Sequence, residues 1–208
     1  MRQSSKGQKK LRKKQILYGA VALFLVAGLV LSAVLGFVDF LTGGQGANKD
    51  PSILKLEEEI ATLEKSLKKD VENGLLAAEI GTLYYDMATI SWQQGLQKQG
   101  NKYGEKSRKY LIQAVENGEI SPEITLDIAF LAFSLEDYDT AEEYFQKTID
   151  QEEQNPIAHI YYGLYLSNLE REKEAIEHFA KALEYAPEDS PEAQAAEYYL
   201  SLLQETGS

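Results

Sequence analysis

The stretch "AIEHFAKALEYAP", residues 175–187, decides the fold expected for this chain. It has small residues at Ala175 and Ala182, an aromatic residue at Phe179 between them, and a proline at Pro187. Steps of three and four residues place the first three side chains on one face of a helix. Proline cannot continue a helix, so the helix is expected to end just before Pro187. This pattern favours a helix packed closely against a neighbour over a catalytic or binding site.

The same arrangement of side chains returns along the chain with a period of 34 residues. The corresponding triplets are Ser107, Leu111 and Ala114; Ala141, Phe145 and Thr148; and Ala175, Phe179 and Ala182. Three pairs of a helix-capping residue and a proline repeat with spacings of 34 and 35 residues: Ser121-Pro122, Asn155-Pro156 and Ser190-Pro191. A constant period of this length predicts stacked helix–turn–helix units.

Residues 156–189 resemble the tetratricopeptide repeat (TPR), a helix–turn–helix motif of about 34 residues. The matching signature positions are Gly163, Ala175, Phe179, Ala182 and Pro187. Residues 122–155 resemble the motif through Ala129, Ala141, Phe145 and the turn "LEDYDTA", and residues 74–121 form a longer unit with an insertion at 91–104. The resemblance implies an all-α fold over residues 52–206, with about three TPR-like repeats in an α-solenoid and a closing helix at 190–205.

An apolar segment precedes the repeats. Residues 16–38 contain no charged side chain over 23 positions. A helix of this length is about 34 Å long, enough to cross a hydrocarbon core of about 30 Å. The alternative is a cleaved signal peptide, but its apolar region usually has about 7–15 residues, and "TGGQGANKD" offers no good small-x-small cleavage site. We therefore expect a transmembrane helix over 16–41.

The charges on the two sides of this segment predict its orientation. Residues 1–15 carry seven basic side chains and no acidic one, whereas residues 48–208 hold 14 of the 21 basic and 32 of the 33 acidic side chains, a net charge of −18. Basic flanks stay on the cytoplasmic side of a membrane. We expect a cytoplasmic arm at 1–15, a flexible linker at 42–51 and a helical domain outside the cytoplasm. Its negative charge repels phosphates and argues against nucleic-acid binding.

The chain offers no constellation of catalytic residues. It has no cysteine, which excludes disulfides and thiolate metal sites and favours a bacterial envelope over a eukaryotic secretory lumen. His159 and His178 are 19 residues apart and lack a metal-binding spacing. Acidic runs such as "EDYDTAEEY" lack the glycine and the ligand spacing of a calcium loop. We expect no enzymatic activity, no metal and no cofactor.

In TPR arrays the first helix of each unit lines a concave groove, so the resemblance implies a protein or peptide client there. The groove residues that it implies are Tyr85, Leu126, Phe130, Phe133, Ile160, Leu164 and Asn168, with Tyr198 at the end. Glu79, Asp86 and Asp127 share this face and no lysine or arginine does, which favours an apolar or basic client segment over an acidic one. For Leu126, Phe130 and Ile160, the alternative is a place in the core.

Three further features each have two interpretations. On the insertion, Trp92 and Leu96 either hold a longer hairpin together or contact a partner. Within the apolar segment, Gly28, Ser32 and Gly36 share one helix face and permit close pairing of two helices. The apolar stripe over 53–67 is typical of a short coiled coil or of packing on the first repeat. The sequence thus predicts a non-enzymatic, membrane-tethered scaffold or chaperone-like adaptor, and the alternative is a self-associating structural membrane protein.

Overall fold

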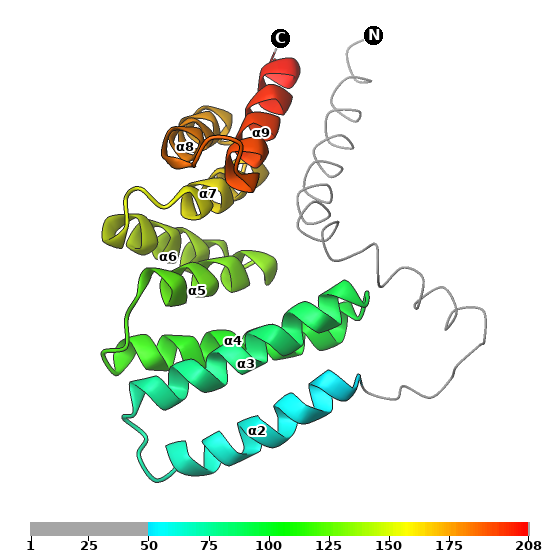
Figure 1. Ribbon diagram of the computed structural model, residues 1–208, viewed down its shortest axis with the longest axis vertical. Helices are drawn as coiled ribbons and strands as arrows, with labels where there is room; N and C mark the ends of the chain where they lie inside the picture. The colour runs from blue at the N-terminus through cyan, green and yellow to red at the C-terminus, as the bar shows by residue number, and fades with distance from the viewer. Residues whose placement is uncertain (1–49, 208) are drawn as a thin grey trace, which may run out of the picture.

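A computed structural model describes residues 50–207, which form an all-helical array (Figure 1). Its helices are α2 (Pro51–Leu67), α3 (Gly74–Gln93), α4 (Gln97–Glu116), α5 (Pro122–Ser134), α6 (Tyr138–Gln151), α7 (Pro156–Asn168), α8 (Glu172–Tyr185) and α9 (Pro191–Gly207). The expected arm at 1–15, the apolar segment with Gly28, Ser32 and Gly36, and most of the linker lie outside the described residues. Within residues 50–207, no helix has both the length and the apolar character needed to cross a membrane.

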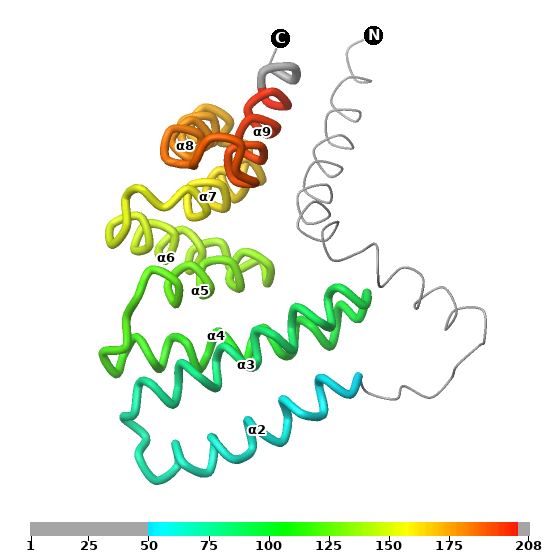
Figure 2. Tube along the Cα trace, in the orientation of Figure 1, coloured from blue at the N-terminus to red at the C-terminus, as the bar shows by residue number. Residues whose placement is uncertain are grey.

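The helices pair into hairpins that stack in chain order. Figure 2 shows α2 at one end and α9 at the other, with the hairpins α3–α4, α5–α6 and α7–α8 between them. Each hairpin contributes its first helix to one side of the stack and its second helix to the other. The predicted all-α solenoid of helix–turn–helix units is therefore confirmed.

Helices α5 and α7 begin where a polar side chain precedes proline. Ser121 Oγ accepts a hydrogen bond from the N–H of Ile124 at 3.3 Å, and Asn155 Oδ1 accepts one from the N–H of Ala158 at 3.0 Å. A proline follows each cap, at the first helical position, where a backbone N–H would have no acceptor within the helix. These local contacts determine where α5 and α7 start.

The three hairpin turns share one backbone geometry. In each, an N–H donates to the carbonyl five residues earlier, at 2.9 to 3.0 Å: Leu96 to Ser91, Asp137 to Ala132, and Arg171 to Leu166. The residue before each donor has a positive φ, 74° at Gly95, 63° at Glu136 and 64° at Glu170. This geometry is the Schellman ending of a helix. Glycine adopts it freely, whereas a residue with a Cβ is strained in it.

Small residues on the first helix of a repeat let the second helix approach closely. A Cβ at Gly163 would lie 2.7 Å from the Phe179 ring, and a Cβ at Gly81 would lie 2.6 Å from Leu111 Cδ2. Both distances are too short for a real contact, so only glycine fits there without a shift of the neighbour. Ala129, which is fully buried, lies 34 residues before Gly163.

The stretch at 175–187 belongs to the core. Ala175, Phe179 and Ala182 are each at most 1% exposed. Phe179 also stacks on Tyr199 of α9 with 5.1 Å between ring centroids, and Phe145 of the preceding repeat stacks on Tyr162 at 5.4 Å. The phenylalanine of one repeat thus joins the second helix to the next element of the stack.

The insertion lengthens the first hairpin. Helices α3 and α4 have 20 residues each, compared with 13 and 14 in the next two hairpins. Since a helix rises about 1.5 Å per residue, the extra turns add roughly 10 Å. Figure 1 shows this hairpin extending beyond α5–α6 at one end.

The apolar stripe of α2 packs on the first repeat. Ile53, Ile60 and Leu67 are 4%, 3% and 6% exposed and belong to one cluster with α3 and α4. Glu64 of α2 also accepts hydrogen bonds from the hydroxyls of Tyr84, at 3.2 Å, and Tyr110, at 3.0 Å. A coiled coil formed through this stripe is therefore not available to the folded chain, which removes one of the two faces expected for self-association.

The turn geometry predicts opposite effects for two substitutions. Gly95→Ala should lower the free energy of unfolding by about 1 kcal/mol, because the added Cβ meets nothing within 4 Å and only the backbone strain changes. Glu136→Gly should leave the protein as stable or raise its stability by up to about 1 kcal/mol, since it relieves the same strain. Urea denaturation of both variants measures these changes. A loss of stability in Glu136→Gly larger than that in Gly95→Ala would contradict this account of the turns.

Candidate functional site

Three aromatic rings form a row along the first helices of the repeats. Tyr85 of α3 and Phe130 of α5 have ring centroids 6.1 Å apart, and Phe130 and Tyr161 of α7 have centroids 5.3 Å apart. All three side chains are half-buried. The row therefore crosses the three hairpins on their first-helix side and remains partly open to solvent.

Two carboxyl groups accompany these rings. Asp86 follows Tyr85 on α3 and is exposed, while Asp127 precedes Phe130 by one turn of α5 and is half-buried. Burial, and then the nearby carboxylates of Asp86 and Glu123, raise the pKa of Asp127 to about 7. Burial, and then the charge of Asp127, raise the pKa of Tyr161 to about 12. We call the set Tyr85, Asp86, Asp127, Phe130 and Tyr161 the aromatic–acidic surface.

This surface lacks a cation of its own. Within residues 50–207, Asp86 and Asp127 form neither an ion pair nor a side-chain hydrogen bond. Lys55 of α2 lines an open groove of about 430 Å³ together with Asp86, but no ion pair joins the two. The groove lies between α2 and α3 and extends the surface from Asp86 toward α2.

The structure brings together only part of the predicted groove. Tyr85, Phe130 and the half-buried Asn168 lie on the open side of the first helices, and Tyr198 on α9 is 43% exposed. Leu126 and Phe133 are only partly buried and pack against the core, where Phe133 meets the ring of Tyr165 edge-on at 5.7 Å.

Two predicted groove residues are in the core instead. Ile160 is 1% exposed and Leu164 is 9% exposed. Helix α7 is packed by α5, α6, α8 and α9, so only a narrow strip of it faces outward. That strip carries Ile157, Tyr161 and Asn168. The prediction for Ile160 and Leu164 as partner contacts is therefore wrong.

Tyr161 is the residue of this surface that the predicted groove does not include. It follows Asp127 by 34 residues, which is the repeat period. Because Asp127 is expected on the open face, the repeat period indicates the same face for Tyr161.

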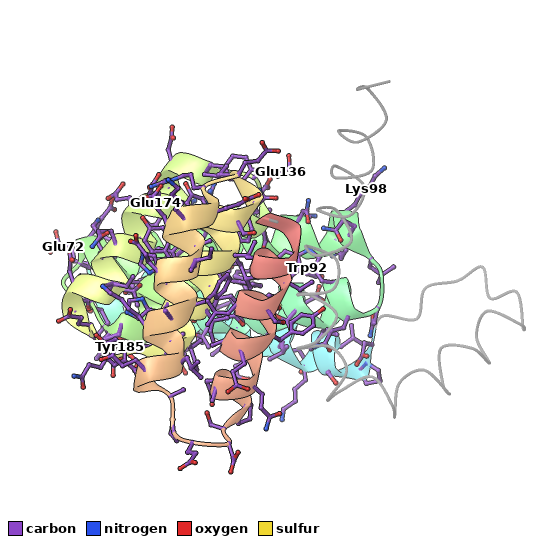
Figure 3. All side chains as sticks on the ribbon, turned by 90° about the horizontal axis from the view of Figure 1, so that it is seen from above. Glu72, Trp92, Lys98, Glu136, Glu174 and Tyr185 are labelled. Carbon is purple, nitrogen blue, oxygen red and sulfur yellow. The ribbon has the colours of Figure 1, made fainter. Side chains whose placement is uncertain are left out.

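The insertion residues have different environments. The indole Nε1 of Trp92 donates a hydrogen bond to Asn101 Oδ1 at 3.0 Å, and a Cβ at Gly100 would overlap the ring. Trp92 thus holds α3 and α4 together, whereas Leu96 in the turn is 50% exposed. In Figure 3, Lys98 marks the outer end of the hairpin and Trp92 lies nearer the stacked helices.

The two histidines meet although they are distant in sequence. Their Nδ1 atoms are 2.9 Å apart, and Nε2 of His159 lies 2.8 Å from the carbonyl oxygen of Glu153. A carbonyl only accepts, so Nε2 of His159 carries a hydrogen and its Nδ1, in the neutral ring, accepts one from His178. Burial, followed by the charge of His159, lowers the pKa of His178 to about 4. Both imidazoles are neutral at pH 7, and their hydrogen bond connects α8 to α7. No group of three metal-ligating side chains lies within the described part of the chain.

Comparisons with known proteins found solved structures similar to this one. The structure resembles a crystal structure of MamA with a TM-score of 0.60 and 18% sequence identity, over 76% of this chain and 85% of that one. It also resembles YrrB, described as a TPR protein with an unusual peptide-binding site, with a TM-score of 0.46 and 17% identity, over 70% of this chain and 83% of that one. No family model and no curated protein matches the sequence. At this identity the likeness to MamA supports a TPR-type fold and leaves function to be argued from the surface.

The raised pKa of Asp127 predicts a stabilising substitution. Its ordinary value is 3.8, so between pH 3.8 and about 7 the unfolded chain loses this proton more readily than the folded chain does. Ionisation then costs the folded state at most about 4 kcal/mol, and the cost is complete above pH 7. Asp127→Asn should therefore raise the free energy of unfolding at pH 8 and have little effect at pH 3.

Chemical denaturation at both pH values measures this difference. Asp139→Asn is the matched control, because Asp139 is an exposed carboxyl in the first turn of α6. Lower stability of Asp127→Asn at pH 8 would contradict the proposed electrostatic environment.

Proposed function

We propose that this protein is a non-enzymatic scaffold or chaperone-like adaptor that binds a segment of a client protein along the first helices of its repeats. The aromatic–acidic surface supports the proposal most directly. Half-buried aromatic rings bury a large area with little loss of side-chain freedom, and for this reason they are common in interfaces. Here they are carried by the first helices of three successive hairpins in one stack, so their mutual positions are rigid.

The polarity of this surface argues for a peptide-like partner. A small apolar ligand would need an enclosed cavity, and the groove between α2 and α3 is not enclosed. A client segment can instead cross several hairpins and contact one ring after another. The net charge of −18 on residues 48–208 disfavours nucleic acid and acidic segments.

We also propose that the scaffold is tethered to a bacterial cell membrane. Support comes from the uncharged segment 16–38 and the seven basic side chains before it. In this arrangement the N-terminus is cytoplasmic and the helical domain lies on the outer side of the membrane. The lipid bilayer is then a second partner, contacted through residues 16–41.

Site-specific photocrosslinking tests the client surface. Benzoylphenylalanine in place of Phe130 should crosslink a defined protein in intact membranes, because Phe130 lies at the centre of the aromatic row. The same probe in place of Gln146, exposed on the second helix α6, is the matched control and should yield no such product. Identical products from both positions, or none from either, would contradict the proposed surface.

Protease protection tests the tether. Protease added to cells stripped of their outer layers should cut residues 50–207 and leave a fragment in the membrane fraction, whereas a chain that begins at residue 48 should leave the membrane on carbonate washing. Protection of the helical domain until the membrane is dissolved would exclude the proposed orientation. Release of the full chain by carbonate would exclude the tether itself.

A further inference from the structure

The aromatic–acidic surface contains two carboxyl groups that have no counter-ion within residues 50–207. Asp86 and Asp127 come from neighbouring hairpins, and each contributes to the electrostatic environment of the hydroxyl of Tyr85. The titratable groups that face Asp127 are Tyr85 and Asp86 of α3, Glu123 of α5 and Tyr161 of α7. None of them is basic, so the described part of the chain supplies Asp127 with no counter-ion.

The surroundings of Asp127 make water a poor permanent partner for its ionised carboxylate. Its charge acts on the hydroxyls of Tyr85 and Tyr161, and burial is the largest cause of its raised pKa. A purely apolar ligand laid across the rings would remove the remaining water and leave the carboxylate without a partner, which costs several kcal/mol. An acidic ligand would add repulsion. A cation relieves both costs.

The rings restrict which cation fits. A lysine or arginine side chain has an apolar stem that packs against aromatic rings while its charged end remains with polar partners. The charge can also lie over a ring face, which adds about 0.5 to 2 kcal/mol, and form charge-assisted hydrogen bonds to carboxylates. Inorganic cations have no apolar stem to pack against the three rings, so the surface favours an organic cation on an apolar chain.

The spacing of the rings sets the context of this side chain. The centroid distances of 6.1 Å and 5.3 Å limit the row from Tyr85 to Tyr161 to about 11 Å. An extended peptide advances about 3.3 Å per residue and needs about four residues to cover it. One basic residue opposite Asp86 and Asp127 would then have apolar residues on either side, opposite Phe130, Tyr161 and the groove at Leu56 and Ile90.

We infer that the aromatic–acidic surface is a subsite for one lysine or arginine side chain of the client, flanked by apolar residues, with Asp86 and Asp127 as its counter-ions. This inference rests on the proposed function and specifies the chemistry of the partner. It also explains why a carboxyl that destabilises the free protein lies at the centre of the surface, because the client's cation completes the pair.

Selection from a library of random heptapeptides displayed on phage tests this subsite. The target is the full-length protein in mild detergent at 0.15 M salt, which screens long-range attraction. The selected peptides should carry lysine or arginine about tenfold above its frequency in the library at one position between apolar residues. The variant Asp86→Asn/Asp127→Asn should still select apolar peptides and lose the basic position. The control Asp139→Asn/Asp150→Asn removes two exposed charges from α6 and should keep it.

A pH series on one selected peptide gives an independent measure. Binding of the cation requires ionised Asp127, so affinity should fall about tenfold from pH 8 to pH 6 in the wild type. Asp127→Asn should bind more weakly than the wild type at pH 8, and its affinity should change little between the two pH values. This variant is expected to be the more stable protein at pH 8, so its weaker binding cannot reflect unfolding.

The outcomes separate the subsite from the proposed function. Peptides that bind the wild type without a basic position, or with one that survives in Asp86→Asn/Asp127→Asn, would overturn the subsite and leave the client surface in place. If no peptide is selected by any variant, the proposed function itself fails, and the subsite fails with it.

Discussion

The close approach of the two helices within each repeat is the contact on which the rest of the structure depends. At Gly163 the backbone of α7 touches the ring of Phe179, and at Gly81 the backbone of α3 touches Leu111. A single hairpin of this kind buries too little apolar surface to be stable by itself. The ring that fills one hairpin also stacks on the next element, as Phe179 does on Tyr199. Pairing within hairpins and stacking between them are thus provided by the same side chains.

This packing leaves the outer side of the first helices available for binding. The second helices direct their phenylalanines inward, while Tyr85, Phe130 and Tyr161 remain half-exposed along α3, α5 and α7. Because each helix is held on its other sides by the stack, the rings stay in place without a partner. Asp127 has an unfavourable environment among them, with its pKa raised to about 7. A costly group on a rigid, solvent-accessible surface is more readily explained by binding than by stability.

The periodic features of the fold could be predicted from the sequence. Whether an individual residue lies on the buried or the open side of its helix could be predicted only in part. The caps at Ser121 and Asn155 act within three residues, so local sequence was sufficient to locate them. On α7 the prediction favoured Ile160 and Leu164, whereas Tyr161 is the half-exposed residue. Neighbouring helical residues differ in direction by about 100°, and α7 is apolar on nearly every side. The pattern therefore could not show which side α9 would cover. The contact of His159 with His178 was equally hidden, since it depends on how α8 lies against α7.

The sequence by itself determined the period of 34 residues, the starts of the helices, the small residues that permit close packing and the acidic charge of the domain. These properties act through contacts within a turn or a hairpin, where spacing along the chain equals spacing in the helix. Tertiary structure alone decided which ring faces solvent, that α2 covers the first repeat through Ile53 and Ile60, and that two carboxyls from separate hairpins lie near Tyr85. Such relations depend on the rotation of each helix about its own axis. That rotation is set by the packing of the whole stack and has no signature in a single repeat.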